Sequence, residues 1–277
     1  MEHTFHTRHD FTPELGWAAF QLLAELGAEG TTLEGLEVAA RELASPLARR
    51  SDLRKLLLSL VQLGLVHSAE DRLTLSVAGQ ALAVTSGRYE AGFHAAVHCL
   101  YTWRWLWDGN KSIATPSWSY QRVCQEIRSA GTLGIEPDAI VLKVATTAEQ
   151  FGAERVSFSR SSVNGVAAWL KAQVPPLISD IGSKLAMIAR PRPGLTVVRF
   201  QIAALCGMHK GDVAMTTAAI ENLANALVVP PQELNWILRD FSEACDEFSV
   251  VGNGKRIIYR GSSDSFLEWV INGRHND

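Results

Sequence analysis

The apolar positions between residues 53 and 83 follow two different periods in turn. Leu53, Leu56, Leu57 and Leu60 recur at helical spacing and predict a helix that ends near Gly64, a residue type common just after a helix C-terminus. Residues 65–66 and 73–75 alternate instead, as strands do, on either side of a polar turn at 68–71. A second helical stretch continues to residue 83. The pattern therefore predicts a helix, a β-hairpin and another helix.

Two further helices are expected before this segment. Thr12 and Pro13 are good residues for the N-cap and first turn of a helix that continues to about residue 26. Thr31 and Glu34 have the spacing of a capping box and predict a second helix through about residue 43. With the third helix and the hairpin, these elements form a first module at residues 11–85.

This order resembles that of bacterial winged-helix regulators, in which a run of the form lGLv…LT..G..L closes the domain. The resemblance covers residues 11–85 and is carried by Leu63, Gly64, Leu65, Val66, Leu73, Thr74, Gly79 and Leu82. It implies that the third helix and the hairpin, or wing, contact nucleic acid or a protein partner.

The remaining chain divides into four further segments. Residues 88–115 predict a buried aromatic helical bridge, and residues 116–183 have the helical order of a second winged-helix module without an evident wing. Residues 184–199 are basic and rich in Pro and Gly, which is typical of a linker. Residues 200–262 predict helices and a hairpin with an Asn253-Gly254 turn. The expected fold is mainly α with short β-hairpin wings, as tandem winged-helix modules joined by a helical bridge.

Charge is distributed unevenly around a net value of −3. Residues 1–90 have 8 Lys/Arg and 12 Asp/Glu, residues 91–195 have 11 and 7, and residues 196–277 have 7 and 10. A phosphate-binding surface should therefore draw mainly on the middle third. No apolar run reaches the roughly 18–20 residues of a membrane span, and the N-terminus lacks a secretory signal. The four scattered cysteines are typical of a reducing compartment, so we expect no membrane partner and a cytoplasmic location, nucleoid-associated if DNA is bound.

Basic and short polar residues at helix starts and on the last hairpin are the candidate nucleic-acid contacts. Arginine binds phosphates and base edges, and short polar groups allow close approach to the backbone. Ordinary solvated helix starts would have the same composition. The candidates are Arg49, Arg50, Arg54 and Lys55, then Arg155, Arg160, Ser161, Asn164 and Lys171, then Arg190 and Arg192, and finally Lys255 and Arg256.

Signals for catalysis or metal binding are weak. His94 and His98 share one helical face, but Ala95 occupies the position where a zinc protease motif has Glu. The sequence has no phosphate-binding loop, dinucleotide-binding glycine motif or nucleophile elbow. We therefore expect no catalytic residues, no cofactor and no metal.

These features predict a non-enzymatic DNA-binding protein that acts as a subunit of a larger prokaryotic DNA-processing, defence or regulatory complex. Its expected partners are double-stranded DNA and a protein, which can be a second copy of the chain. One alternative is a structural adaptor with little DNA affinity, similar in layout to tandem winged-helix subunits of chromosome-organising complexes. The acidic stretch at residues 233–247 favours protein contacts there. Another alternative is a ligand-responsive repressor whose bridge holds a small molecule.

Overall fold

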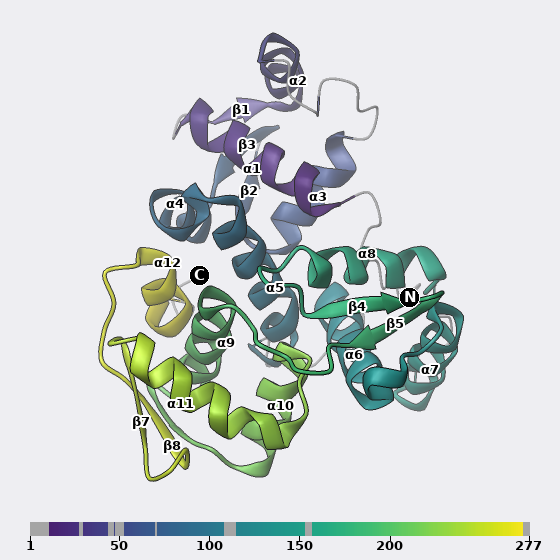
Figure 1. The fold of residues 1–277 in the computed structure, drawn as a ribbon. Helices are drawn as coiled ribbons and strands as arrows, with labels where there is room; N and C mark the ends of the chain where they lie inside the picture. The colour runs from purple at the N-terminus through teal and green to yellow at the C-terminus, as the bar shows by residue number, and fades with distance from the viewer. Residues whose placement is uncertain are drawn as a thin grey trace.

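Helix α5 (Glu90–Trp107) lies at the centre of the molecule, with three groups of elements packed around it (Figure 1). The computed structural model describes residues 11–27, 30–43, 47, 53–69, 71–107, 115–152 and 157–273. Twelve successive residues of α5, from Gly92 to Trp103, are buried. Over this stretch α5 is buried on all of its faces and therefore lies in the interior of the molecule.

The N-terminal unit contains a helix, a short strand, two helices and a hairpin. Its strands form an antiparallel sheet in the order β1-β3-β2. The hairpin is followed by α4 (Val77–Val84) and a short 3₁₀ turn, Ser86–Arg88. The elements of the unit are α1 (Pro13–Leu26), β1 (Thr31–Thr32), α2 (Leu33–Glu42), α3 (Leu53–Gln62), β2 (Val66–Ala69) and β3 (Arg72–Leu75).

The C-terminal unit has the same order of elements and the same strand order, β6-β8-β7. It ends in α12 (Ser265–Glu268) and a π-helical turn, Trp269–Gly273, which packs on α9. Asn253 and Gly254 in the hairpin turn have φ of 56° and 83°, which confirms the predicted turn. The elements are α9 (Leu195–Met208), β6 (Asp212–Ala214), α10 (Thr217–Leu227), α11 (Leu234–Ala244), β7 (Phe248–Val251) and β8 (Arg256–Tyr259).

The middle unit repeats this order with its first strand reduced to one residue. Ile135 forms an isolated antiparallel bridge with Leu185, so the pairing order is Ile135, then β5, then β4. Its elements are α6 (Pro116–Ala130), α7 (Pro137–Gln150), α8 (Arg160–Lys171), β4 (Ile178–Ile181) and β5 (Lys184–Met187). Within the described residues the order helix, strand, helix, helix, hairpin therefore occurs three times.

Two predictions for the middle of the chain are wrong: the absence of a wing in the middle module and the linker at residues 184–199. The hairpin β4–β5 exists where the sequence shows no wing, because Leu185, Ala186 and Met187 are buried in succession and so produce no alternating pattern. The range 184–199, expected to be a linker, contains β5 and the first turn of α9. Only residues 188–194 connect these two elements.

Threonine side chains cap the first or second helix of each unit. Thr12, Thr32, Thr115 and Thr216 accept hydrogen bonds from backbone amides three residues ahead, at 3.0–3.4 Å. The residue that caps α2 lies one position after the predicted Thr31. Thr31 pairs with Leu73 in the sheet, and Thr32 caps α2 instead.

One continuous apolar core joins the three units. It includes Phe20 of α1, Trp118 of α6 and Phe200 of α9, each at most 1% exposed. Helix α5 contacts all three of these helices. The mainly helical fold with small antiparallel sheets is therefore confirmed, and the described helices include none with the length and apolarity that a membrane crossing requires.

Candidate nucleic-acid interface

The third helix of the middle unit, α8, has one buried face and one polar exposed face. Val163, Val166 and Leu170 are fully buried against the core. Arg160, Ser161 and Asn164 are exposed on the first turns of the helix. No residue between 160 and 171 is acidic. The exposed face therefore offers a cation, a hydroxyl and an amide within two turns, which are the groups that bind phosphates and base edges.

Two contacts with the core hold α8 in place. Trp169 Nε1 donates a 2.9 Å hydrogen bond to the backbone carbonyl of Phe11, ahead of α1. Just beyond the helix, the Gln173 amide donates to the carbonyls of Trp169 and of His94 in α5, at 2.8 and 3.2 Å. These bonds link α8 to the N-terminal unit and to α5, so its exposed face has a fixed orientation.

Carboxylates lie beside both cations of α8. Arg160 Nη1 is 3.5 Å from Asp138 Oδ2 of α7, and Lys171 Nζ is 2.7 Å from Asp180 Oδ2 of β4. All four side chains are at least 39% exposed. Exposed pairs of this kind contribute only about 0–1 kcal/mol to stability. A phosphate can therefore replace the carboxylate as the partner of either cation at little cost in stability.

In the N-terminal unit, α3 has a comparable surface. Arg54 and Lys55 are exposed on its first turn, and residues 53–62 contain no acidic side chain. Leu58, 40% exposed, lies one turn further along the same helix. The predicted contacts Arg49, Arg50 and Arg155 lie outside the described residues.

The third helix of the C-terminal unit has the opposite character. Asp240 and Glu243 are exposed on α11, where Asn235 and Arg239 are the other exposed polar residues. Arg239 Nε is 4.0 Å from Asp240 Oδ1. This acidic face would repel a phosphate backbone.

The remaining predicted contacts lie away from the third helices. Lys255 is exposed on the β7–β8 turn, and Arg190 and Arg192 are exposed between β5 and α9. Arg256 is exposed but donates to both carboxylate oxygens of Asp212 on β6, with Nε 2.6 Å from Oδ1. This bond and the charge of Arg256 lower the pKa of the Asp212 carboxyl. Arg256 is thus already held by a carboxylate, which the sequence could not reveal because 44 residues separate the two.

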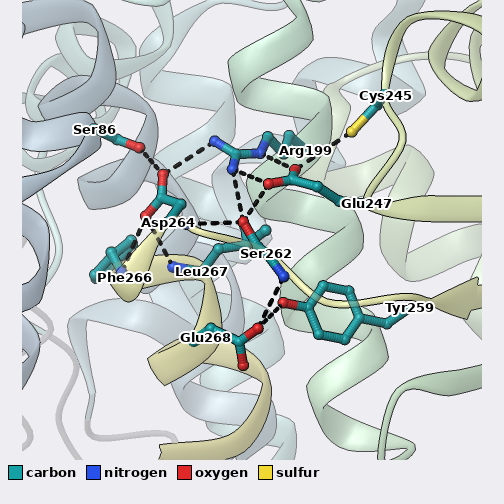
Figure 2. Close-up of polar contacts among 10 residues, drawn as sticks. All are labelled: Ser86, Arg199, Cys245, Glu247, Tyr259, Ser262, Asp264, Phe266, Leu267 and Glu268. Atoms are coloured by element: carbon teal, nitrogen blue, oxygen red, sulfur yellow. Dashed lines mark hydrogen bonds and ion pairs between the residues drawn. The ribbon is translucent and has the colours of Figure 1, made fainter.

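A polar cluster in the C-terminal unit was not predicted from the sequence. Figure 2 shows Arg199 of α9 between Glu247, which precedes β7, and Asp264, which caps α12. Arg199 donates to both carboxylates, and Nη1 lies 3.0 Å from Asp264 Oδ2. Ser262 donates to Glu247, and Ser86 of the N-terminal unit donates to Asp264 (Figure 2).

The cluster contains charges that compensate one another. Burial opposes ionisation of Asp264, but the hydrogen bond from Ser86 and the charge of Arg199 outweigh it and lower the pKa of the carboxyl. Burial likewise opposes ionisation of Glu247, and the bonds from Arg199 and Ser262 lower the pKa of that carboxyl. Arg199 donates to both carboxylates, Ser262 donates to Glu247 and Ser86 donates to Asp264, so the cluster connects α9, the segment before β7, α12 and the N-terminal unit. Its residues lie up to 178 positions apart, so no local motif signals it.

The two histidines of α5 also have protein partners. His98 Nε2 lies 2.8 Å from the carbonyl oxygen of Ala226, and Nδ1 lies 2.8 Å from the hydroxyl of Tyr120. His94 Nδ1 lies 3.3 Å from the carbonyl oxygen of Ala172. Among the described residues no group of His, Cys, Asp and Glu has the arrangement of a metal site.

No protein-family model, curated protein or solved structure matches this chain.

Proposed function

We propose that this chain binds double-stranded DNA as a protein of the tandem winged-helix type, with α8 as a principal contact. The observation that carries the proposal is the repeated order helix, strand, helix, helix, hairpin with one strand order. In proteins with this arrangement the third helix enters the major groove and the hairpin lies beside the backbone. Of the three third helices, α3 and α8 have two cations each and no carboxylate.

The exposed side chains of α8 suit contacts with base edges and with phosphates. Arg160 and Asn164 are of the types that bind guanine and adenine edges, respectively, with two hydrogen bonds. Arg160 and Lys171, at opposite ends of the helix, suit phosphates on either side of a groove. The exposed hairpin residue Lys184 adds a cation in the same unit.

Fluorescence anisotropy with a labelled duplex across a salt series tests the proposal. The double variant Arg160→Gln/Asn164→Ala should weaken binding by roughly tenfold or more and reduce the salt slope by about 1. Helix α11 offers a matched control, because Asn235 and Arg239 are the same residue types, exposed and also four positions apart. The variant Asn235→Ala/Arg239→Gln should change affinity by less than about twofold. Absence of duplex binding at low salt, or equal loss in both variants, would contradict the proposal.

A structural adaptor is the second candidate, favoured by the surface of the C-terminal unit. A groove of about 210 Å³ lies between α9 and α11 and is lined by Leu195, Trp236 and Phe241, with Asp240 at its side. Apolar anchors with a polar rim are typical of protein interfaces. Light scattering across a concentration series distinguishes the two functions for a second copy as partner. A chain that self-associates, loses self-association with Leu195→Asp and does not bind DNA would be an adaptor.

A further inference from the structure

A groove of about 250 Å³ lies on the N-terminal unit, between α1 and the end of α4 with the 3₁₀ turn that follows it. Its α1 wall includes Trp17, Gln21 and Glu25. These residues are four positions apart, so they form one row along the helix surface. The row places an indole, an amide and a carboxylate side by side along the groove.

The opposite wall has small side chains and one cation. Ala83 and Gly87 contribute little side-chain volume, which leaves the groove open, and Arg88 lies beside them. Arg88 is the last residue of the 3₁₀ turn, whose Ser86 hydroxyl donates a hydrogen bond to Asp264 of the C-terminal unit. The backbone that carries Arg88 is therefore held in place.

The indole of Trp17 provides a fixed apolar surface in the groove. Trp17 is half-buried, and its ring centroid lies 5.5 Å from that of Phe93 and 6.4 Å from that of Phe20. Both phenylalanines are buried in the core. Because these contacts fix the ring, its exposed part can pack against an apolar group of a ligand without first being ordered.

Glu25 and Arg88 give the groove one charge of each sign. Both side chains are exposed, and among the described residues neither is in an ion pair. The Gln21 amide, on the same wall as Glu25, can both donate and accept hydrogen bonds. A matching ligand therefore has an anionic and a cationic group close together, next to an apolar part.

We infer that this groove binds an apolar α-amino acid in its zwitterionic form. The ligand carboxylate pairs with Arg88, its ammonium group pairs with Glu25, and its side chain packs on Trp17. A ligand of this size is expected to have a Kd of about 1 mM. The groove is separate from the exposed face of α8, so ligand binding can be tested without DNA.

Three probes with the same phenyl ring separate the roles of the two charges. L-Phenylalanine has both charged groups, 2-phenylethylamine lacks the carboxylate and 3-phenylpropionate lacks the ammonium group. Ligand-observed NMR titration measures the Kd of each. Arg88→Gln should weaken L-phenylalanine about tenfold and 2-phenylethylamine less than twofold. Glu25→Gln should weaken L-phenylalanine about tenfold and 3-phenylpropionate less than twofold.

The role of the apolar surface is tested without a substitution. L-Serine has the same charged groups but no apolar side chain, so it should bind about tenfold more weakly than L-phenylalanine. Because Glu25 and Arg88 are exposed, both variants should keep the unfolding midpoint of the parent protein. Absence of L-phenylalanine binding at about 20 mM overturns the inference. Equal losses of L-phenylalanine and 2-phenylethylamine in Arg88→Gln also overturn it.

The groove between α9 and α11 provides a matched control, because Arg192, Asp240 and Trp236 line it. Its polar groups already have partners: Arg239 lies 4.0 Å from Asp240, and the Trp236 indole donates to Glu233. Arg192→Gln/Asp240→Asn should therefore leave the affinity for L-phenylalanine within about twofold of the parent value. A loss in this variant, with no loss in Arg88→Gln, would place the ligand between α9 and α11 and overturn the inference.

Discussion

The hydroxyl of Tyr120 donates a 2.8 Å hydrogen bond to Nδ1 of His98, in the fully buried centre of the molecule. The direction of this bond follows from the other side of the ring. The Ala226 carbonyl, 2.8 Å from Nε2, can only accept a hydrogen bond, so Nε2 holds the proton and Nδ1 is the acceptor. One imidazole therefore joins α5, α6 and α10, which come from the bridge, the middle unit and the C-terminal unit.

Replacing Tyr120 with phenylalanine should destabilise the protein by about 1–3 kcal/mol, because His98 Nδ1 is left buried without a donor. The ring stays in place against Tyr101, whose centroid is 5.0 Å away. Urea unfolding at pH 7.5 measures the effect. Tyr89→Phe is the control, since Tyr89 is 74% exposed and loses no buried bond. Equal stability of the two variants would show that the hydrogen bond contributes nothing.

Stability should also depend on pH through His98. Burial lowers the pKa of His98 to about 4, whereas the unfolded chain has the ordinary value of 6.5. As the pH falls below 6.5, the unfolded state gains a proton that the folded state does not, so stability decreases until the pH reaches about 4. Between pH 7.5 and 5 this contribution amounts to about 2 kcal/mol.

The variant His98→Gln isolates this contribution, because a glutamine amide can donate to Ala226 and accept from Tyr120 but does not titrate. Burial also lowers the pKa of His94, but that residue is present in both proteins. Urea unfolding at several pH values should give a steeper loss for the parent protein. Parallel stability curves for the two proteins would be inconsistent with a neutral His98.

The sequence predicts those parts of the fold that depend on local signals. Thr12 and Pro13 begin α1, Gly64 follows α3 with a positive φ, and Asn253-Gly254 forms the last turn, all as expected. These predictions succeed because caps and turns require particular residue types within four or five positions. The short strands β1 and β6 have two and three residues, too few for a period to be detected.

The candidate interface could be predicted only in part. The acid-free start of α8 is visible in the sequence, and Arg160, Ser161 and Asn164 are exposed there. The carboxylates beside the cations come from other elements, as Asp138 does for Arg160. The Ser86–Asp264 contact joins two units, and no pattern along the chain indicates that these residues meet.

The Asp264 carboxylate should be important for stability. It pairs with Arg199 and accepts hydrogen bonds from the Phe266 and Leu267 amides at 3.0 and 3.2 Å. Asp264→Ala should cost about 3 kcal/mol or more, because it leaves a partly buried guanidinium with one partner fewer and removes a helix cap. Asp264→Asn retains the cap and should cost less.

Thermal and urea unfolding measure these losses. Asp212→Ala is the control, because the Asp212–Arg256 pair is exposed and should contribute little to stability. If Asp264→Ala and Asp212→Ala behave alike, the cluster around Arg199 does not stabilise the fold.

Removing the carboxylates beside α8 should strengthen DNA binding if α8 contacts the duplex. Asp138 and Asp180 pair with Arg160 and Lys171, so their replacement frees both cations and removes two charges that repel phosphate. Asp138→Asn/Asp180→Asn should raise duplex affinity by about three- to tenfold and steepen the salt slope by up to about 1 for each cation that gains a phosphate. Fluorescence anisotropy between about 50 and 200 mM salt measures both quantities.

The matched control removes the same number of charges from α11. Asp240→Asn/Glu243→Gln alters the net charge equally, on a helix that the proposal places away from DNA. Its duplex affinity should stay within about twofold of that of the parent protein. A gain of equal size in both variants would point to net charge and not to the α8 surface. A loss of affinity in Asp138→Asn/Asp180→Asn would mean that the two ion pairs maintain the binding surface instead of competing with phosphate for it.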